Sequence, residues 1–122
     1  MKIIKYKSIN NDESMIAFKF DISEVMSWGG FGICDWCNEL SDTHYFIPEL
    51  GLKTSCEKCF KDYQKRAKWY YEDTDAVCNI ILMFFLNYYR LDDKQIEEVQ
   101  EFFNEHKRGK FSVKDILKQG GM

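Results

Sequence analysis

Two closely spaced pairs of cysteines are the residues of this sequence best suited to chemistry. Cys34 pairs with Cys37 and Cys56 pairs with Cys59, each time across two residues, and 18 residues (38–55) separate the pairs. This is the spacing of a structural zinc site with four thiolate ligands. Four sulfurs complete a tetrahedron around Zn²⁺ and leave no position open for a substrate water. We therefore expect one structural Zn²⁺ per chain, bound by Cys34, Cys37, Cys56 and Cys59.

Three other uses of these cysteines are less well supported. Disulfides need an oxidising compartment, and the segment Met1–Tyr6 lacks the long apolar stretch of a secretion signal. A redox-active pair could form at either C-x-x-C, but two pairs at this spacing favour joint binding of a metal. Iron also accepts four thiolates, and zinc is preferred because nothing else in the sequence indicates electron transfer.

The composition predicts a single domain with its own hydrophobic core. Of the 122 residues, 45% are hydrophobic and 16% aromatic, so the metal adds to a core and does not replace one. The net charge of −3 does not favour nucleic acid as a partner. The longest apolar run, 76–89, contains two asparagines and is shorter than the ~20 residues that cross a bilayer. We expect a cytoplasmic protein with no membrane partner.

The residues before the cysteines predict a β-hairpin. Apolar side chains alternate with others from Ile16 to Ile22, which is the period of a half-buried strand. Residues 2–7 are its expected partner strand, and Asn10-Asn11-Asp12 tolerates turn geometry. The glycine-rich segment Ser27–Gly32 lacks a phosphate-binding pattern, so we expect it to give backbone room for the first cysteine turn.

Short strands and a helix are expected around the second cysteine pair. Residues 44–47 and 50–53 predict two strands, and Asn38 suits the left-handed conformation common after a cysteine turn. Ser55 can cap a helix that runs to about Tyr71, with Glu57 in its first turn. Such a helix start lowers thiol pKa and so favours the thiolates that zinc requires.

The last part of the chain predicts helices. One begins at 73–75 and continues through the apolar run 76–89, which is apolar nearly all round and suits a central core helix or a subunit interface. Asp92 or Asp93 can cap a third helix, and Ser112 with Asp115 resembles a capping box that opens a short last one.

The order of these parts resembles a known class of zinc finger. A C-x-x-C in a turn, a short hairpin and a second C-x-x-C that opens a helix look like the treble-clef class, and LIM-type modules share the spacing. The stretches 31–37, 56–60 and 66–73 are similar to small zinc-finger proteins of low-G+C bacteria and their phages. That resemblance covers roughly residues 30–75, and it implies a zinc site but no established activity. The expected fold class is α+β, with an N-terminal β-hairpin (1–30, including the glycine-rich approach), a treble-clef four-cysteine zinc finger with its helix (31–72), and C-terminal helices (73–122).

The leading functional hypothesis is a non-catalytic, zinc-stabilised protein-interaction module, because closed metal sites build shape rather than chemistry. Trp36 and Trp69 are the candidate partner contacts. The partner is expected to be a protein, or a second copy of this chain through residues 76–89. By analogy, the phage-like resemblance implies a role in modulating a host complex.

A nucleic-acid-binding finger is the alternative hypothesis. Basic residues exceed acidic ones by four between 53 and 68, beside aromatic rings that could stack on bases. The ordinary explanation is that lysines offset the formal −2 charge of zinc with four thiolates, or line a solvated helix face. The candidate contacts are Lys58, Lys61, Lys65, Arg66 and Lys68.

A treble-clef nuclease of the HNH-like kind is a remote alternative. Asp42 and His44 lie between the cysteine pairs, where a metal-binding histidine would be expected. The match then fails, because Phe60 follows the last cysteine in place of asparagine or histidine. Catalysis needs a positioned base and a cation-binding group, and the sequence offers one candidate at most. We therefore expect no enzymatic activity.

Overall fold

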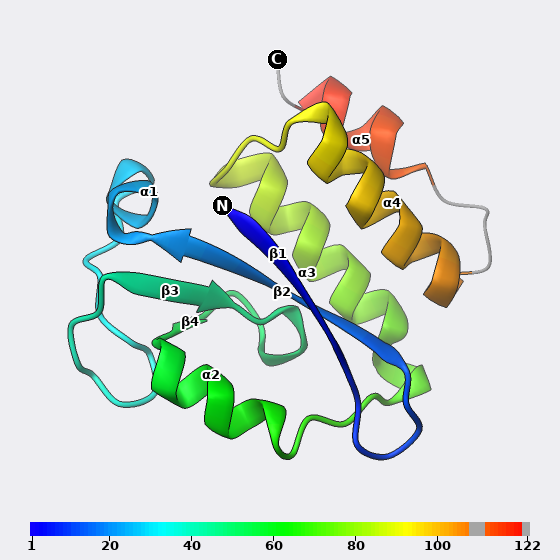
Figure 1. Ribbon diagram of the computed structural model, residues 1–122. Helices are drawn as coiled ribbons and strands as arrows, with labels where there is room; N and C mark the ends of the chain where they lie inside the picture. Colours follow the sequence, from blue (N-terminus) through cyan, green and yellow to red (C-terminus); the bar gives the residue numbers. More distant parts are fainter. Residues whose placement is uncertain (108–111, 121–122) are drawn as a thin grey trace. The chain divides into compact units, whose positions relative to one another are not determined.

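The alternating residues of the N-terminal segment form the first two strands of an antiparallel sheet, as predicted. The computed structural model describes residues 1–107 and 112–120. Its sheet has the order β1-β2-β3-β4 (Figure 1). The strands are β1 (Lys2–Lys7), β2 (Ser14–Asp21), β3 (Thr43–Phe46) and β4 (Thr54–Ser55).

The turn between β1 and β2 uses the residues that the sequence indicated. The backbone N–H of Ser8 donates to the carbonyl oxygen of Glu13 at 2.9 Å, and Asp12 has a φ of +52°. Aspartate tolerates this left-handed conformation better than most residues. The hairpin register pairs Lys2 with Lys19 and Lys7 with Ser14.

Helix α2 (Glu57–Gln64) packs on one face of this sheet through a cluster of buried apolar side chains. Phe60 from the helix stacks on Tyr45 of β3, with ring centroids 4.3 Å apart. Ala17 and Ile47 complete the buried cluster. Burying a side chain of this size contributes about 2 kcal/mol, so the cluster fixes the helix on the sheet.

Two expectations for this region were wrong. The predicted second strand at 50–53 lies instead at Thr54–Ser55, because Pro48–Leu50 forms a short 3₁₀ helix (η1) after β3. The sequence reading also missed helix α1 (Ile22–Ser27). That helix begins with a capping box in which Asp21 accepts from the N–H of Glu24 at 2.8 Å and Glu24 accepts from the N–H of Asp21 at 3.1 Å.

Helix α2 ends at Gln64, well before the predicted end near Tyr71. Beyond it, the N–H of Ile9 donates to the carbonyl of Ala67, and Asn10 binds both the N–H and the carbonyl of Trp69. These contacts with the β1–β2 turn give the backbone after Gln64 partners outside a helix. Tertiary contacts therefore outweigh helical periodicity here.

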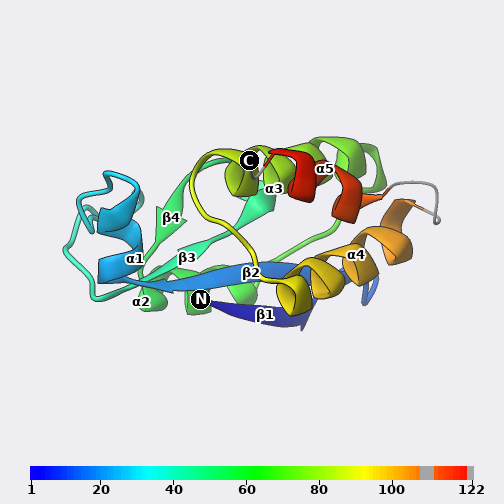
Figure 2. The same ribbon diagram turned by 90° about the horizontal axis from the view of Figure 1, so that it is seen from above.

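The chain divides into two compact units, Met1–Trp69 and Tyr70–Met122. The second contains the 3₁₀ helix η2 (Tyr71–Asp73) and the helices α3 (Thr74–Asn87), α4 (Asp93–Lys107) and α5 (Val113–Gly120), which pack on one another (Figure 2). Asp92 caps α4 by accepting from the N–H of Gln95 at 2.8 Å, as predicted. Within the described ranges, no helix has the length and apolar character needed to span a membrane. A single domain over 1–122 stays a prediction.

Candidate metal centre

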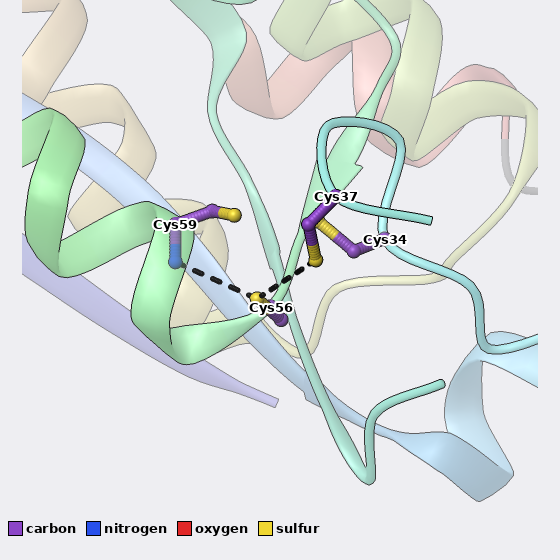
Figure 3. A group of neighbouring side chains, drawn as sticks. All are labelled: Cys34, Cys37, Cys56 and Cys59. Atoms are coloured by element: carbon purple, nitrogen blue, oxygen red, sulfur yellow. Dashed lines mark hydrogen bonds between the residues drawn. The ribbon is translucent and has the colours of Figure 1, made fainter. Parts of the chain in front are cut away.

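The four predicted ligands meet at one point. The Sγ atoms of the four cysteines all lie within 4.8 Å of one another (Figure 3). The sulfurs of Cys37 and Cys56, which come from different pairs, are 3.8 Å apart. A tetrahedron with metal–sulfur bonds of about 2.3 Å has edges of about 3.8 Å. The cysteines are therefore positioned to hold a metal ion.

The first pair lies in a tight turn, residues 33–40, which we call the knuckle. Cys34 closes it by donating its N–H to the carbonyl of Glu39 and accepting from the N–H of Asn38, both at 2.9 Å. Asn38 has a φ of +60°, the left-handed conformation predicted for it. The N–H of Trp36 points at the Cys34 sulfur at 3.4 Å, and such a contact favours the thiolate form.

The second pair opens helix α2. Cys56, and not the predicted Ser55, is the N-cap, and its sulfur accepts from the N–H of Cys59 at 3.5 Å (Figure 3). Both ligands therefore lie at the helix start, where free N–H groups stabilise negative charge. Phe60, the next residue, belongs to the buried cluster described above. The core thus holds the metal-binding end of the helix in place.

Two hydrogen bonds between the knuckle and β4 bring the pairs together. The N–H of Asp35 donates to the carbonyl of Thr54 at 3.0 Å, and the N–H of Thr54 donates to Asp35 Oδ2 at 2.7 Å. Since β4 leads directly into Cys56, this double contact fixes the distance between the ligand pairs. Sequence reasoning missed the role of Asp35, whose only signal was a hydrogen-bonding side chain inside the cysteine turn.

Gly32 allows the chain to enter the knuckle. Its φ is +74°, and a Cβ at this position would lie 2.1 Å from Cδ1 of Ile22. Only glycine avoids both the backbone strain and the clash.

The negative charge that the four thiols can carry favours a bound cation. Although burial opposes ionisation, N–H groups of Cys37, Cys56 and Trp36 lower the pKa of the Cys34 thiol to about 7. By contrast, burial and the neighbouring sulfurs raise the pKa of the Cys59 thiol. One thiolate forms readily, and its charge then opposes ionisation of the other three thiols, because like charges this close repel. A bound dication would let all four thiols ionise together.

The five predicted basic contacts are all exposed, but they do not form one helical stripe. Helix α2 ends before Lys65, Arg66 and Lys68, so the five residues do not share one helix face. Acidic neighbours also pair with two of the five. Lys61 Nζ lies 3.4 Å from Glu57 Oε1, and Arg66 Nη1 lies 2.7 Å from Asp62 Oδ2.

The two predicted partner-contact tryptophans differ in exposure. Trp36 is 41% exposed on the knuckle, whereas Trp69 is 2% exposed. His44, considered above for a nuclease, is fully buried on β3, and its Nε2 lies 2.8 Å from the carbonyl oxygen of Ser41. Trp36 is therefore the tryptophan available to a partner.

Sequence reasoning also missed a buried carboxyl group behind α2. Glu49 Oε2 accepts from the hydroxyls of Tyr6 at 3.3 Å and Tyr63 at 3.2 Å. Its Oε1 is buried without a hydrogen-bond partner among the described residues. Burial raises the pKa of Glu49 to about 7, although its hydrogen bonds act in the opposite direction. No periodicity marks this residue, because it lies in a 3₁₀ turn.

Comparisons of this chain with models of protein families, with curated proteins and with solved structures found no match. The resemblance to bacterial and phage zinc fingers thus stays a prediction.

Proposed function

We propose that this chain is a zinc-stabilised protein-interaction module without catalytic chemistry. The observation that carries the proposal is the convergence of four cysteine sulfurs within 4.8 Å of one another. Four thiolates close the coordination shell, so a bound ion would build shape and would offer no position to a substrate. Zinc is the favoured ion because it accepts tetrahedral thiolates without redox chemistry.

The order of elements around the site supports the treble-clef description. The knuckle supplies two ligands, the β3–β4 pair follows, and the start of α2 supplies the other two, Cys56 at its N-cap and Cys59 in its first turn. In this arrangement the metal joins a loop to a helix, and the surface of the loop becomes rigid.

Exposed apolar side chains on and beside the knuckle support a protein partner. Phe31 and Leu40 are 84% and 80% exposed, and Ile33 and Trp36 are more than two-fifths exposed. Ile33 and Leu40 are bridged across the turn, so they lie side by side. Large apolar side chains gathered at a surface are typical of interaction sites. The phage-like resemblance extends this proposal to a host protein complex as the partner.

Variants of exposed residues on and beside the knuckle test the proposal. Elemental analysis of the native protein is expected to find one zinc per chain. The double variant Phe31→Ser, Leu40→Ser should keep that zinc and lose co-elution with a partner from cell extract. Met26→Ser is the matched control, because Met26 is 64% exposed on α1, outside the knuckle. Iron or no metal would contradict the zinc assignment, and a partner retained by the double variant would contradict the interface.

Nucleic-acid binding through the basic residues remains the competing proposal. Retention on DNA or RNA that weakens with salt, and is lost when Lys58, Lys65 and Lys68 are changed to glutamate, would favour it. Cleavage of nucleic acid that depends on added metal would instead indicate a nuclease.

A further inference from the structure

Strand β1 forms one edge of the sheet in the unit Met1–Trp69. The described strands lie in the order β1-β2-β3-β4, so β1 pairs with β2 on one side and with no described strand on the other (Figure 2). We call this outer side the β1 edge. The knuckle contacts β4 at the opposite edge of the sheet, through Asp35 and Thr54. The β1 edge is therefore a surface separate from the knuckle.

The register of the hairpin decides which backbone groups of β1 point away from β2. The N–H of Ser8 donates to the carbonyl of Glu13, directly opposite it. Hydrogen-bonded and non-hydrogen-bonded pairs alternate along an antiparallel ladder, so Ile3, Lys5 and Lys7 direct their N–H and C=O groups outward. An extended segment laid along these groups would add a strand to the sheet.

The side chains of β1 divide into charged and apolar ones. Lys2, Lys5 and Lys7 are exposed, the other three residues are half-buried, and the strand contains no acidic residue. Of the half-buried residues, Ile4 and Tyr6 pack against the buried cluster under α2. An added strand would cover more of these apolar side chains and would place its own side chains beside the lysines.

The lysines select the strand that can occupy this edge. Lysine on an edge strand opposes pairing with a strand of the same charge, and a second copy of β1 would bring three further lysines to it. An acidic strand would instead be attracted at each lysine.

We propose that the β1 edge receives an extended acidic segment of a protein partner as an added antiparallel strand. Carboxylates of that segment lie opposite the lysines, and its apolar residues lie opposite Ile4 and Tyr6. The β1 edge involves neither the metal nor the knuckle. Failure of this proposal would therefore leave the proposed zinc-stabilised function standing.

A peptide that complements β1 tests the assignment by fluorescence anisotropy with the full chain. For an antiparallel strand the sequence is Glu-Val-Glu-Val-Val-Glu, whose first residue lies opposite Lys7 and whose last lies opposite Lys2. At low salt it should bind with a Kd on the order of 100 μM. Lys-Val-Lys-Val-Val-Lys should bind about tenfold more weakly, because each cross-strand charge pair changes from attraction to repulsion. The preference should shrink at high salt.

Two N-methylated forms of the acidic peptide separate strand addition from charge attraction alone. The third and fifth peptide residues would lie opposite Lys5 and Ile3 and bond to their backbones, whereas the second and fourth would point away. N-methylation of the third and fifth residues should therefore abolish binding. N-methylation of the second and fourth is the matched control and should preserve it. Equal effects of the two patterns, or no binding of the unmodified peptide, would overturn the assignment.

Charge reversal on β1 provides a second test. The double variant Lys5→Glu, Lys7→Glu should invert the preference, so that the lysine peptide binds more tightly. Lys53→Glu, Lys58→Glu is the matched control, because both lysines are exposed outside β1, and it should keep the preference for the acidic peptide. An unchanged preference in the β1 variant, or an equal loss in the control, would contradict the proposal. A dimeric chain that binds neither peptide would instead indicate a second copy at this edge.

Discussion

The buried carboxyl of Glu49 should make the stability of the first unit depend on pH. The pKa of Glu49 is raised from 4.5 to about 7 in the folded chain. The groups that face it are the hydroxyls of Tyr6 on β1 and Tyr63 on α2, and burial dominates over their hydrogen bonds. Between these pKa values the folded state keeps a proton that the unfolded state has lost.

The sign of the effect follows from proton linkage. Because the folded state binds more protons than the unfolded state, the free energy of unfolding falls as pH rises through this window. A difference of one pKa unit corresponds to about 1.4 kcal/mol. Ionisation of Glu49 should therefore lower the free energy of unfolding by on the order of 3 kcal/mol above pH 7. Its contribution is most favourable below about pH 4.5 and is lost as pH passes 7.

Glu49→Gln isolates this contribution, because glutamine accepts the two tyrosine hydroxyls and does not ionise. At pH 5 the variant should be more stable by roughly 1 kcal/mol, and by pH 8 this difference should grow to about 3 kcal/mol. Urea unfolding at fixed free zinc, followed by tryptophan fluorescence, measures this. Trp28, Trp36 and Trp69 all lie in Met1–Trp69, so the signal reports that unit.

Zinc release at low pH affects both proteins and cancels in the difference between them. Glu57→Gln is the matched control for loss of a surface carboxylate, since the Glu57 side chain is 54% exposed and paired with Lys61. A stability difference between wild type and Glu49→Gln that stays constant from pH 5 to 8 would refute the reasoning.

Three further predictions concern the metal centre. Gly32→Ala should destabilise the protein by about 1–3 kcal/mol more than Gly29→Ala in urea unfolding. Both glycines have positive φ, so backbone strain cancels in the comparison, and only at Gly32 does the added Cβ meet a side chain, that of Ile22. Asp35→Ala should weaken zinc binding about 10–100-fold in a chelator competition, whereas Glu39→Ala should not, because Glu39 holds Cys34 through its backbone carbonyl. Removing zinc with a chelator at pH 7 should lower the urea midpoint reported by tryptophan fluorescence, and an unchanged midpoint would mean that the ion carries no folding energy.

How far the sequence could predict this structure depended on whether the signals were local. Cysteine spacing, the strand pattern from Ile16 to Phe20 and the turn residues before Glu13 all act within a few residues, and the structure contains the cysteine cluster, the strand and the turn. The half-buried character predicted for the strand was wrong, because Ile16, Ala17 and Phe18 are all 0% exposed. The end of α2 could not be predicted in this way. It is decided by Asn10, which is 59 residues from Trp69 in the sequence and binds its backbone.

The same distinction between local and long-range signals holds for the candidate metal centre. The spacing of the cysteines predicted the ligands, whereas the contact between Asp35 and Thr54 joins residues 19 apart in the sequence and could not be predicted from it. Helix α1 is a different case, because the capping box from Asp21 to Glu24 was readable in the sequence. The alternation of apolar residues continues to Ile22, so the sequence predicted a strand at the residue where α1 begins.

Helix α2 joins the candidate metal centre to the core in one short element. Cys56 is its N-cap and Cys59 lies in its first turn, Phe60 enters the core, and the hydroxyl of Tyr63 donates to Glu49. A helix of eight residues is marginal by itself, so its position must come from these contacts. A metal ion bound by the four cysteines would therefore stabilise the core as well, and unfolding of the core should in turn release the ion.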